Sequence, residues 1–248
     1  MARTAEEIKG AVKEHYGDRA KTAAGASASC CGPTDKVDYR EKLYQLEEVT
    51  NLPETIASFG CGNPTAIAGL REGETVLDLG SGPGLDCFLS AKAVGPNGRV
   101  IGLDMTDEML KLANENKAKL GAANVEFRKG EMESMPIADA DVNVIISNCV
   151  INLSPDKEAV FRESYRVLKP GGRFHVSDIV LSRELSDQEK DDLSLWAGCA
   201  AGALIEGDYL AALSRSGFTD IRVDSRSKIG KKAWYSATIS AFKPAGCC

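Results

Sequence analysis

The sequence predicts an α/β fold built on a doubly wound, mostly parallel sheet. From about residue 73 onward, apolar segments of strand length alternate with segments that have the apolar periodicity of helices. A glycine-rich turn, GSGPG, joins the first of these strands to the first of these helices. Strands and helices that alternate in this way form βαβ units, whose helices cover both faces of the sheet.

The regular part of the chain contains five expected strands and three expected helices. The strands are expected at residues 74–79, 98–104, 125–130, 140–150 and 171–181, and the helices at 85–94, 106–121 and 154–172. Thr106 is the expected N-cap of the second helix, and Gly121 is its C-terminal stop. The third helix is expected to open at Ser154–Pro155 and to close at Pro170–Gly171.

The two ends of the chain depart from this alternation. Before the sheet, helices are expected at residues 5–17 and 38–50, joined by the small-residue arm KTAAGASASCCGPT. After the fifth strand we expect a helix-like insertion at 186–205, a helix at 206–217, and closing strands at 220–225 and 233–242. We therefore expect three parts: an N-terminal helical segment with a CysCys arm (1–72), the sheet core (73–181), and a C-terminal region with cap helices and a CysCys tail (182–248).

The composition excludes several classes of partner. The 248 residues are 43% hydrophobic and 27% charged, as in ordinary globular proteins. The net charge of −6 argues against a nucleic acid or an anionic membrane as partner. The longest apolar runs are shorter than the ~20 residues that span a bilayer, and the segment MARTAEEIKGAVKEHYG lacks the apolar core of a signal peptide. We expect a cytoplasmic protein and, since nothing suggests an obligate interface, a monomer.

The glycine-rich turn has the position of a nucleotide-binding turn, after a strand and before a helix. Gly80, Gly82 and Gly84 allow a ligand to approach the backbone closely, and Ser81 lies between the first two. Asp104 ends the next strand, 20 residues after Gly84, where its carboxylate can accept hydrogen bonds from ribose hydroxyls. Met105 follows it.

The residues around this turn favour a sulfonium cofactor over a dinucleotide. Asp78 lies in the last turn of the first strand, where its charge suits a cationic methionine amine and would repel a pyrophosphate. Glu131 and Met132 end the third strand, where an adenine would lie, and Asn148 ends the fourth. Together with LKPGGRF, these segments resemble the class I S-adenosylmethionine-dependent methyltransferases. The resemblance implies a Rossmann-like sheet of seven strands and S-adenosylmethionine as cofactor.

Eight cysteines are unusual for a protein of this expected location. They lie at positions 30, 31, 61, 87, 149, 199, 247 and 248. In a reducing compartment, surplus thiols are more often catalytic or metal-binding than structural. The chain has no CxxC motif and only two histidines, so a standard zinc site has little support. Cys87 lies on the apolar face of an expected helix, where we expect it to pack in the core.

Three other cysteines are expected near the cofactor. Cys149 follows the fourth strand at its carboxyl end, which we expect to be accessible, and Cys199 lies in the insertion after the fifth strand. Both therefore belong to the sheet edge that carries the active site in this architecture. Cys61 lies between two glycines, which leave its sulfur unshielded. Three thiolates that converge here would bind a soft, thiophilic element.

The cysteine-bearing segments carry a second resemblance. GCGNP, SNCVINLSPDK, LKPGGRFHVSD and CAAGA resemble the arsenite methyltransferase family over essentially the whole chain. This resemblance implies that Cys61, Cys149 and Cys199 bind As(III) and that a fourth thiol, Cys31 or alternatively Cys30, takes part in disulfide exchange. It also implies arsenite or its thiol conjugates as substrate, and a thioredoxin- or glutathione-type reductant. The pair Cys247–Cys248 matches no core motif and either captures the metalloid or is incidental.

The expected chemistry requires no general base. Base candidates are few, since His15 lies in the N-terminal helix and His175 inside a strand. Arsenic(III) bound by three sulfurs has its own lone pair and can attack a methyl group without losing a proton. Two alternatives remain open from the sequence. One is a carbon methyltransferase acting on a quinone or lipid ring, and the other is a thiol-rich metalloid- or zinc-binding protein without methyl transfer.

Overall fold

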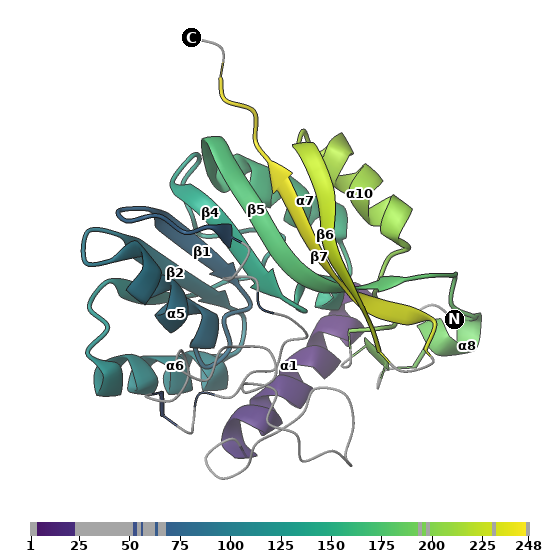
Figure 1. The fold of residues 1–248 in the computed structure, drawn as a ribbon. Helices are drawn as coiled ribbons and strands as arrows, with labels where there is room; N and C mark the ends of the chain where they lie inside the picture. The colour runs from purple at the N-terminus through teal and green to yellow at the C-terminus, as the bar shows by residue number, and fades with distance from the viewer. Residues whose placement is uncertain are drawn as a thin grey trace.

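The computed structural model describes residues 4–22, 52–53, 56, 63, 68–192, 195–196, 199–229 and 232–246, and the described strands form one sheet of seven (Figure 1). The strands are β1 (Thr75–Leu79), β2 (Arg99–Asp104), β3 (Val125–Lys129), β4 (Val142–Asn148), β5 (Leu168–Leu181), β6 (Thr219–Lys228) and β7 (Trp234–Phe242). The helices are α1 (Ala5–Thr22), α5 (Leu85–Val94), α6 (Asp107–Leu120), the 3-10 helix η1 (Ile151–Leu153), α7 (Lys157–Val167), α8 (Asp187–Lys190) and α10 (Glu206–Arg215).

The strand order is β3-β2-β1-β4-β5-β7-β6. The first five strands are parallel, and β7 runs antiparallel between β5 and β6. The predicted doubly wound, mostly parallel sheet of seven strands is therefore confirmed. Strand β1 pairs with β2 on one side and with β4 on the other, so the strand order reverses between β1 and β4. In open α/β sheets, ligands bind at the carboxyl ends of the strands at such a point.

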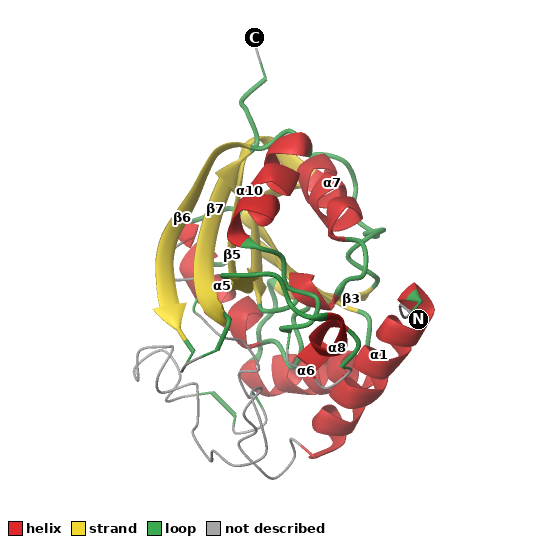
Figure 2. Cartoon of the chain, turned by 90° about the vertical axis from the view of Figure 1, so that its right-hand side faces the viewer, coloured by secondary structure: helices red, strands yellow, loops and turns green. Residues whose placement is uncertain are grey.

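Alternate side chains of the strands face two separate apolar clusters, as the period of two in a strand requires. Leu77 and Leu79 of β1 belong to a cluster that includes Phe161 of α7 and Tyr209 of α10, whereas Val76 packs with α5. Helices α7 and α10 accordingly cover one face of the sheet (Figure 2). Helix α1 contacts α6 and η1, so the N-terminal helix lies against the end of the sheet where the cofactor is expected.

Both ends of α7 differ from the sequence prediction, although Gly121 ends α6 as expected in the left-handed conformation (φ 61°). The third helix, α7, begins after Asp156, whose side chain accepts a hydrogen bond from the Ala159 amide, and not at Ser154. It ends at Val167, because the following residue, Leu168, is already extended and pairs with Val142 of β4. The Pro170 that was expected to close the helix instead lies within β5, two residues beyond its start.

The expected helix-like insertion is wrong as a single element. Helix α8 covers only Asp187–Lys190, opened by a capping box at Ser186, and the backbone around Cys199 forms turns. Residues 195–196 are again helical, so the described part of the insertion consists of separate short helical pieces and turns. The first helix, conversely, extends to Thr22, and the helix expected at 38–50 lies outside the described residues. No helix in the described part of the chain is long and apolar enough to cross a bilayer.

Candidate active site

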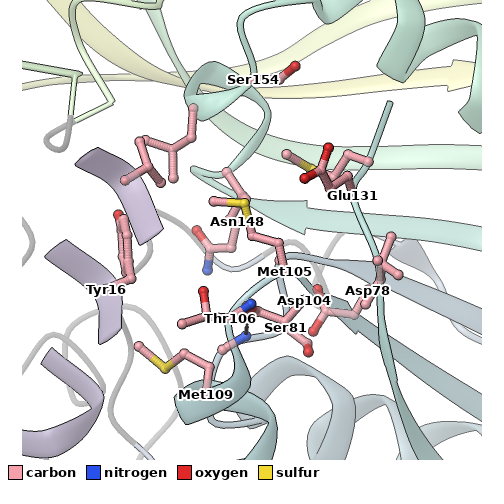
Figure 3. A pocket seen from close by; sticks show the side chains of 18 of the residues that line it. Tyr16, Asp78, Ser81, Asp104, Met105, Thr106, Met109, Glu131, Asn148 and Ser154 are labelled. Carbon is pink, nitrogen blue, oxygen red and sulfur yellow. Dashed lines mark hydrogen bonds between the residues drawn. The ribbon is translucent and has the colours of Figure 1, made fainter. Parts of the chain in front are cut away.

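A cavity lies at the carboxyl ends of β1, β2 and β4, where the strand order reverses (Figure 3). It is lined by nine of the ten residues that the sequence predicted as cofactor ligands: Asp78, Gly80, Ser81, Gly82, Asp104, Met105, Glu131, Met132 and Asn148. Cys149 also lines the cavity. Nine predicted cofactor residues and one predicted arsenic-binding cysteine therefore line the same cavity.

The glycine turn is fixed to the neighbouring strand by its own backbone. The Gly80 and Ser81 amides both donate to the Leu103 carbonyl, at 2.8 and 3.0 Å. Gly80 has a φ of 66°, and a Cβ there would lie 2.3 Å from the Val150 side chain. Only glycine satisfies both conditions, so the turn can lie directly against the cavity.

Gly84 is the predicted cofactor residue that does not line the cavity. It precedes α5 with a φ of 99°, and a Cβ there would lie 2.7 Å from the Phe88 ring and 2.8 Å from the Phe127 ring. Packing of α5 against β3 is therefore enough to require a glycine at this position. Its role as a cofactor contact stays a prediction.

Asp104 is hydrogen-bonded to both loops that border the cavity. One carboxylate oxygen accepts a hydrogen bond from the Gly82 amide at 3.0 Å, and the other accepts one from the Thr106 amide at 2.8 Å. Burial raises the pKa of Asp104, and these amide donors act in the opposite direction. Each oxygen retains a second lone pair, so the expected contact with ribose hydroxyls is compatible with both bonds.

Three carboxylates make this wall of the cavity acidic. Burial raises the pKa of Asp78 well above its usual value, and the negative charges of Asp86 and Asp104 raise it further. Asn148 donates to Asp86 at 3.3 Å, and the buried Ser81 hydroxyl has no partner among the described residues. Such a cluster favours a cationic ligand with hydrogen-bonding groups. The sequence analysis missed Asp86, whose position two residues into α5 gave no indication that it would face the cavity.

Cys87 is fully buried, as predicted, and packs with the apolar cluster on the α5 face of the sheet. Its thiol also donates a hydrogen bond to Asp78 at 3.2 Å, a contact that the sequence did not predict. Burial raises the pKa of Cys87 well above its usual value, and the nearby Asp78 carboxylate raises it further. A thiol in this state is a poor metal ligand.

Helix α1 forms the opposite wall of the cavity. Lys9, Val12 and Tyr16 line it, and Figure 3 shows Tyr16 across the cavity from Asp78. The Lys9 ammonium forms ion pairs with Glu131 at 2.7 Å and with Glu133 at 3.0 Å. The sequence analysis missed this wall, although Ile8, Val12 and Tyr16 are spaced four residues apart and so mark a buried helix face.

The Cys199 thiol, in the insertion, contacts the backbone of Cys149, the residue after β4. The Cys199 thiol donates a hydrogen bond to the Cys149 carbonyl oxygen at 2.7 Å, and the Cys149 amide donates to Ser177 of β5 at 2.7 Å. Both cysteines have a φ of 62°. Their residues are only 2% and 4% exposed, so the expectation of an accessible thiol at the strand end is wrong. Helix α1 and the insertion cover this end of the sheet.

The structure describes three of the eight cysteines. Cys149 is in a disulfide whose partner is not among the described residues, since the other two described cysteines, Cys87 and Cys199, are not disulfide-bonded. Within the described ranges, no group of three His, Cys, Asp or Glu side chains could hold a metal ion. The other predicted or candidate thiols lie outside the described residues: Cys30, Cys31, Cys61, Cys247 and Cys248.

The sequence analysis missed a buried polar cluster around Asp178 of β5. Asn152 donates to Asp178 at 2.7 Å, and the Tyr209 hydroxyl donates to it at 3.4 Å. Burial raises the pKa of Asp178 to about 7, while the Ile179 amide and the nearby Lys157 ammonium act against that rise. Burial lowers the pKa of Lys157 to about 8. Both Asn152 and Lys157 belong to the motif NLSPDK, which the sequence analysis used only as part of the family resemblance.

Comparison with known proteins gives consistent matches over most of the chain. A family model described as a methyltransferase domain matches residues 70–237. An arsenite methyltransferase of Halobacterium salinarum is 42% identical over 269 residues, covering 98% of this chain and 68% of that protein. An arsenite methyltransferase of Homo sapiens is 33% identical over 260 residues, covering 96% and 68%. The crystal structure of an arsenic(III) S-adenosylmethionine methyltransferase from Chlamydomonas reinhardtii, 38% identical, superposes with a TM-score of 0.73 over 82% of this chain and 74% of that chain.

Proposed function

The chain belongs to the arsenite methyltransferase family, and on that premise we propose that it transfers the methyl group of S-adenosylmethionine to As(III) held by cysteine thiolates. One observation carries the proposal beyond family membership. Cys149 lines the cofactor cavity and at the same time contacts Cys199 through its carbonyl oxygen. A soft centre bound by these two sulfurs would therefore lie beside the methyl donor.

The cavity residues fit S-adenosylmethionine. The acidic wall of Asp78, Asp86 and Asp104 would take the methionine ammonium and the ribose hydroxyls, and the unpartnered Ser81 hydroxyl would gain a partner. Glu131 and Met132 would border the adenine, next to α1. When bound, this cofactor supplies a methyl group on a positively charged sulfur, which a nucleophile can attack directly.

Once the disulfide at Cys149 is reduced, Cys149 and Cys199 would supply two sulfur ligands to arsenic. Cys61, outside the described residues, would supply the third. Thiolates are the ligands that soft centres prefer. Neither histidine is placed to act as a base. His15 is exposed on α1, and burial lowers the pKa of His175 within β5 to about 4. The lone pair of arsenic requires no deprotonation, so this substrate needs no general base, unlike a hydroxyl or amine acceptor.

The product of attack carries arsenic in the pentavalent state. Its return to the trivalent state takes two electrons, which two cysteine thiols can supply as they form a disulfide. We propose Cys31, or Cys30 in its place, as the exchanging thiol, and an external dithiol or glutathione-type reductant as the species that restores the disulfide to thiols. We also propose that the protein acts as a monomer in the cytoplasm, where such reductants are available.

The alternative of a carbon methyltransferase acting on a quinone or lipid ring is less well supported. It does not explain the contact between Cys199 and Cys149. In addition, the two arsenite methyltransferases described above match 96–98% of this chain. A thiol-rich binding protein without methyl transfer is disfavoured by the cavity, in which nine expected cofactor residues converge.

The test is a methyl-transfer assay with two acceptors. The reduced protein is incubated with methyl-labelled S-adenosylmethionine and either arsenite or a ubiquinone precursor, and the products are separated chromatographically with detection of both the label and arsenic. Label in methylated arsenic alone supports the proposal. Label in the quinone, or arsenic that binds but is never methylated, would replace it with one of the two alternatives.

A further inference from the structure

The turn that carries Cys199 is held by Trp196. The Cys199 amide donates to the Trp196 carbonyl oxygen at 2.9 Å. A Cβ added to Gly202, at the end of the same turn, would lie 2.4 Å from the Trp196 ring, so the turn and the indole are in direct contact. The indole nitrogen in turn donates to the Lys190 carbonyl at 3.0 Å. Trp196 is therefore joined to the Cys199 turn both by a backbone hydrogen bond and by packing of its indole ring.

Lys157, the first residue of α7, faces the same indole ring. Its ammonium nitrogen lies 5.6 Å from the ring centroid of Trp196, within the range of a cation–π contact. The ammonium also donates to the Ser154 carbonyl oxygen at 2.8 Å, and the residue is only 9% exposed. A buried cation of this kind is costly unless its surroundings compensate it.

Negative groups on several elements compensate the ammonium. Burial lowers the pKa of Lys157 to about 8, and four groups that are negative when ionised act in the opposite direction: Asp178, Cys199, Glu133 and Asp156. Asp178 is itself held by Asn152 and Tyr209, as described above. The Lys157 ammonium thus lies among the Ser154 carbonyl oxygen, the Asp178 carboxylate of β5 and the Trp196 ring.

One short segment, residues 149–157, contains Cys149 and also contacts the turn that carries Cys199. It begins at Cys149, whose carbonyl accepts the Cys199 thiol, and ends at Lys157, which faces Trp196. Between them, the Asn152 carbonyl oxygen approaches the Cys199 turn so closely that a Cβ on Gly202 would lie 2.1 Å from it. The segment thus contacts the Cys199 turn at its start, its middle and its end.

We propose that Lys157 is a positioning residue of the thiol site, which holds the Cys199 turn against Cys149 through the indole ring of Trp196. This inference rests on the proposed arsenic site and names a residue that sets its geometry. Loss of Lys157 should release the Cys199 sulfur while leaving Cys149, at the end of β4, and the cofactor cavity in place. Arsenite binding should suffer, and cofactor binding should not.

A double-mutant cycle on arsenite affinity tests the contact. Lys157→Met and Trp196→Leu are each expected to weaken arsenite binding about tenfold, and the double variant no more than either alone, because one contact is lost in all three. Lys157→Arg keeps a cation over the ring and should restore binding to within about threefold. The KM for arsenite should rise in Lys157→Met while the KM for S-adenosylmethionine stays unchanged.

A matched control comes from a second cation–π pair in the chain. Lys243 lies 4.5 Å from the Tyr165 ring centroid, remote from the thiols, and Lys243→Met should leave arsenite affinity unchanged. Because Lys157→Met leaves Asp178 without its cation, the same substitution is also made with Asp178→Asn, where no buried carboxylate is unpaired. Full arsenite affinity in that folded variant, or strictly additive effects in the cycle, would overturn the inference. A wild-type protein that binds no arsenite would instead refute the proposed function.

Discussion

The Cys199 thiol donates a 2.7 Å hydrogen bond to the backbone carbonyl of Cys149, fifty residues earlier in the chain. Both cysteines have a φ of 62°, in the left-handed region that side-chain-bearing residues rarely adopt. Such a conformation costs on the order of 1–3 kcal/mol and persists only where the surrounding structure imposes it. The proposed arsenic site would give these two strained cysteines a shared ligand beside the cofactor cavity.

The backbone strain at Cys199 predicts an unusual order of stability. Cys199→Gly should have a free energy of unfolding about 1 kcal/mol higher than Cys199→Ala, because glycine adopts a positive φ without the Cβ clash. Denaturant unfolding of the two reduced variants measures the difference. Cys87, inside helix α5, is the matched control, and there alanine should be the more stable by about 1 kcal/mol. Equal stability of the two Cys199 variants would mean that the strain is absent in solution.

Asp104 should contribute to cofactor binding. Asp104→Ala removes the expected ribose contact, and the Gly82 and Thr106 amides lose their hydrogen-bond acceptor. The free energy of S-adenosylmethionine binding should therefore become less favourable by roughly 1.5–3 kcal/mol or more. Calorimetric titration gives the value. The control is Asp107→Ala, since Asp107 is an exposed acid three residues later. This variant should bind S-adenosylmethionine as tightly as the wild type. Unchanged affinity in Asp104→Ala would remove Asp104 from the site.

His175 should make the protein acid-sensitive. Burial, and then the charge of Arg173, lowers its pKa to about 4 from an ordinary value near 6.5. Between these values the unfolded chain binds more protons than the folded one, so the free energy of unfolding should decrease as pH falls from about 6.5 to about 4. His175→Gln should flatten this part of the curve by roughly 2 kcal/mol. An unaltered slope in chemical denaturation at stepped pH would contradict the burial argument, and His15→Gln, on an exposed site, should change the slope less.

Cys31 and Cys61 should behave differently if one exchanges disulfides and the other binds arsenic. Cys31→Ser is expected to bind arsenite but not to complete its methylation, whereas Cys61→Ser should lose binding as well. A monomethylated trivalent substrate needs only two sulfur ligands and is expected to remain a substrate of Cys31→Ser. The measurements are bound arsenic per protein and methylation of both substrates, side by side. Equal losses of binding would refute the separate role, and full activity of Cys31→Ser would direct attention to Cys30.

Local sequence determined much of the fold. The alternation of strands and helices, the glycine turn and Asp104 are encoded within a few residues each, so their positions followed from spacing alone. The limits of α7 and the length of α8 depended instead on pairing and packing: Leu168 joins β5 because Val142 of β4 is its partner. Propensity within the segment could not reveal that contact.

The site was predictable where it lies on strand ends and not where it depends on contacts between distant elements. Asp78, Asn148 and Cys149 lie at or directly after the carboxyl ends of parallel strands, which meet at one edge of the sheet. Tyr16 and Lys157 reach the site from helices whose docking depends on many side chains at once. The same limit explains the incorrect expectation of exposed thiols, because the covering of Cys149 comes from elements far away in the sequence.

The number of sulfur atoms bound to arsenic is the most direct test of the central claim. Arsenic K-edge X-ray absorption would be recorded on the reduced protein with one equivalent of arsenite and no added small thiol. We predict three sulfur neighbours in the wild type and in Cys87→Ala, and two sulfurs with one oxygen in Cys199→Ser, since oxygen replaces the lost soft ligand. Three sulfur neighbours retained in Cys199→Ser would contradict the account, because arsenic would then be bound away from the contact between Cys149 and Cys199.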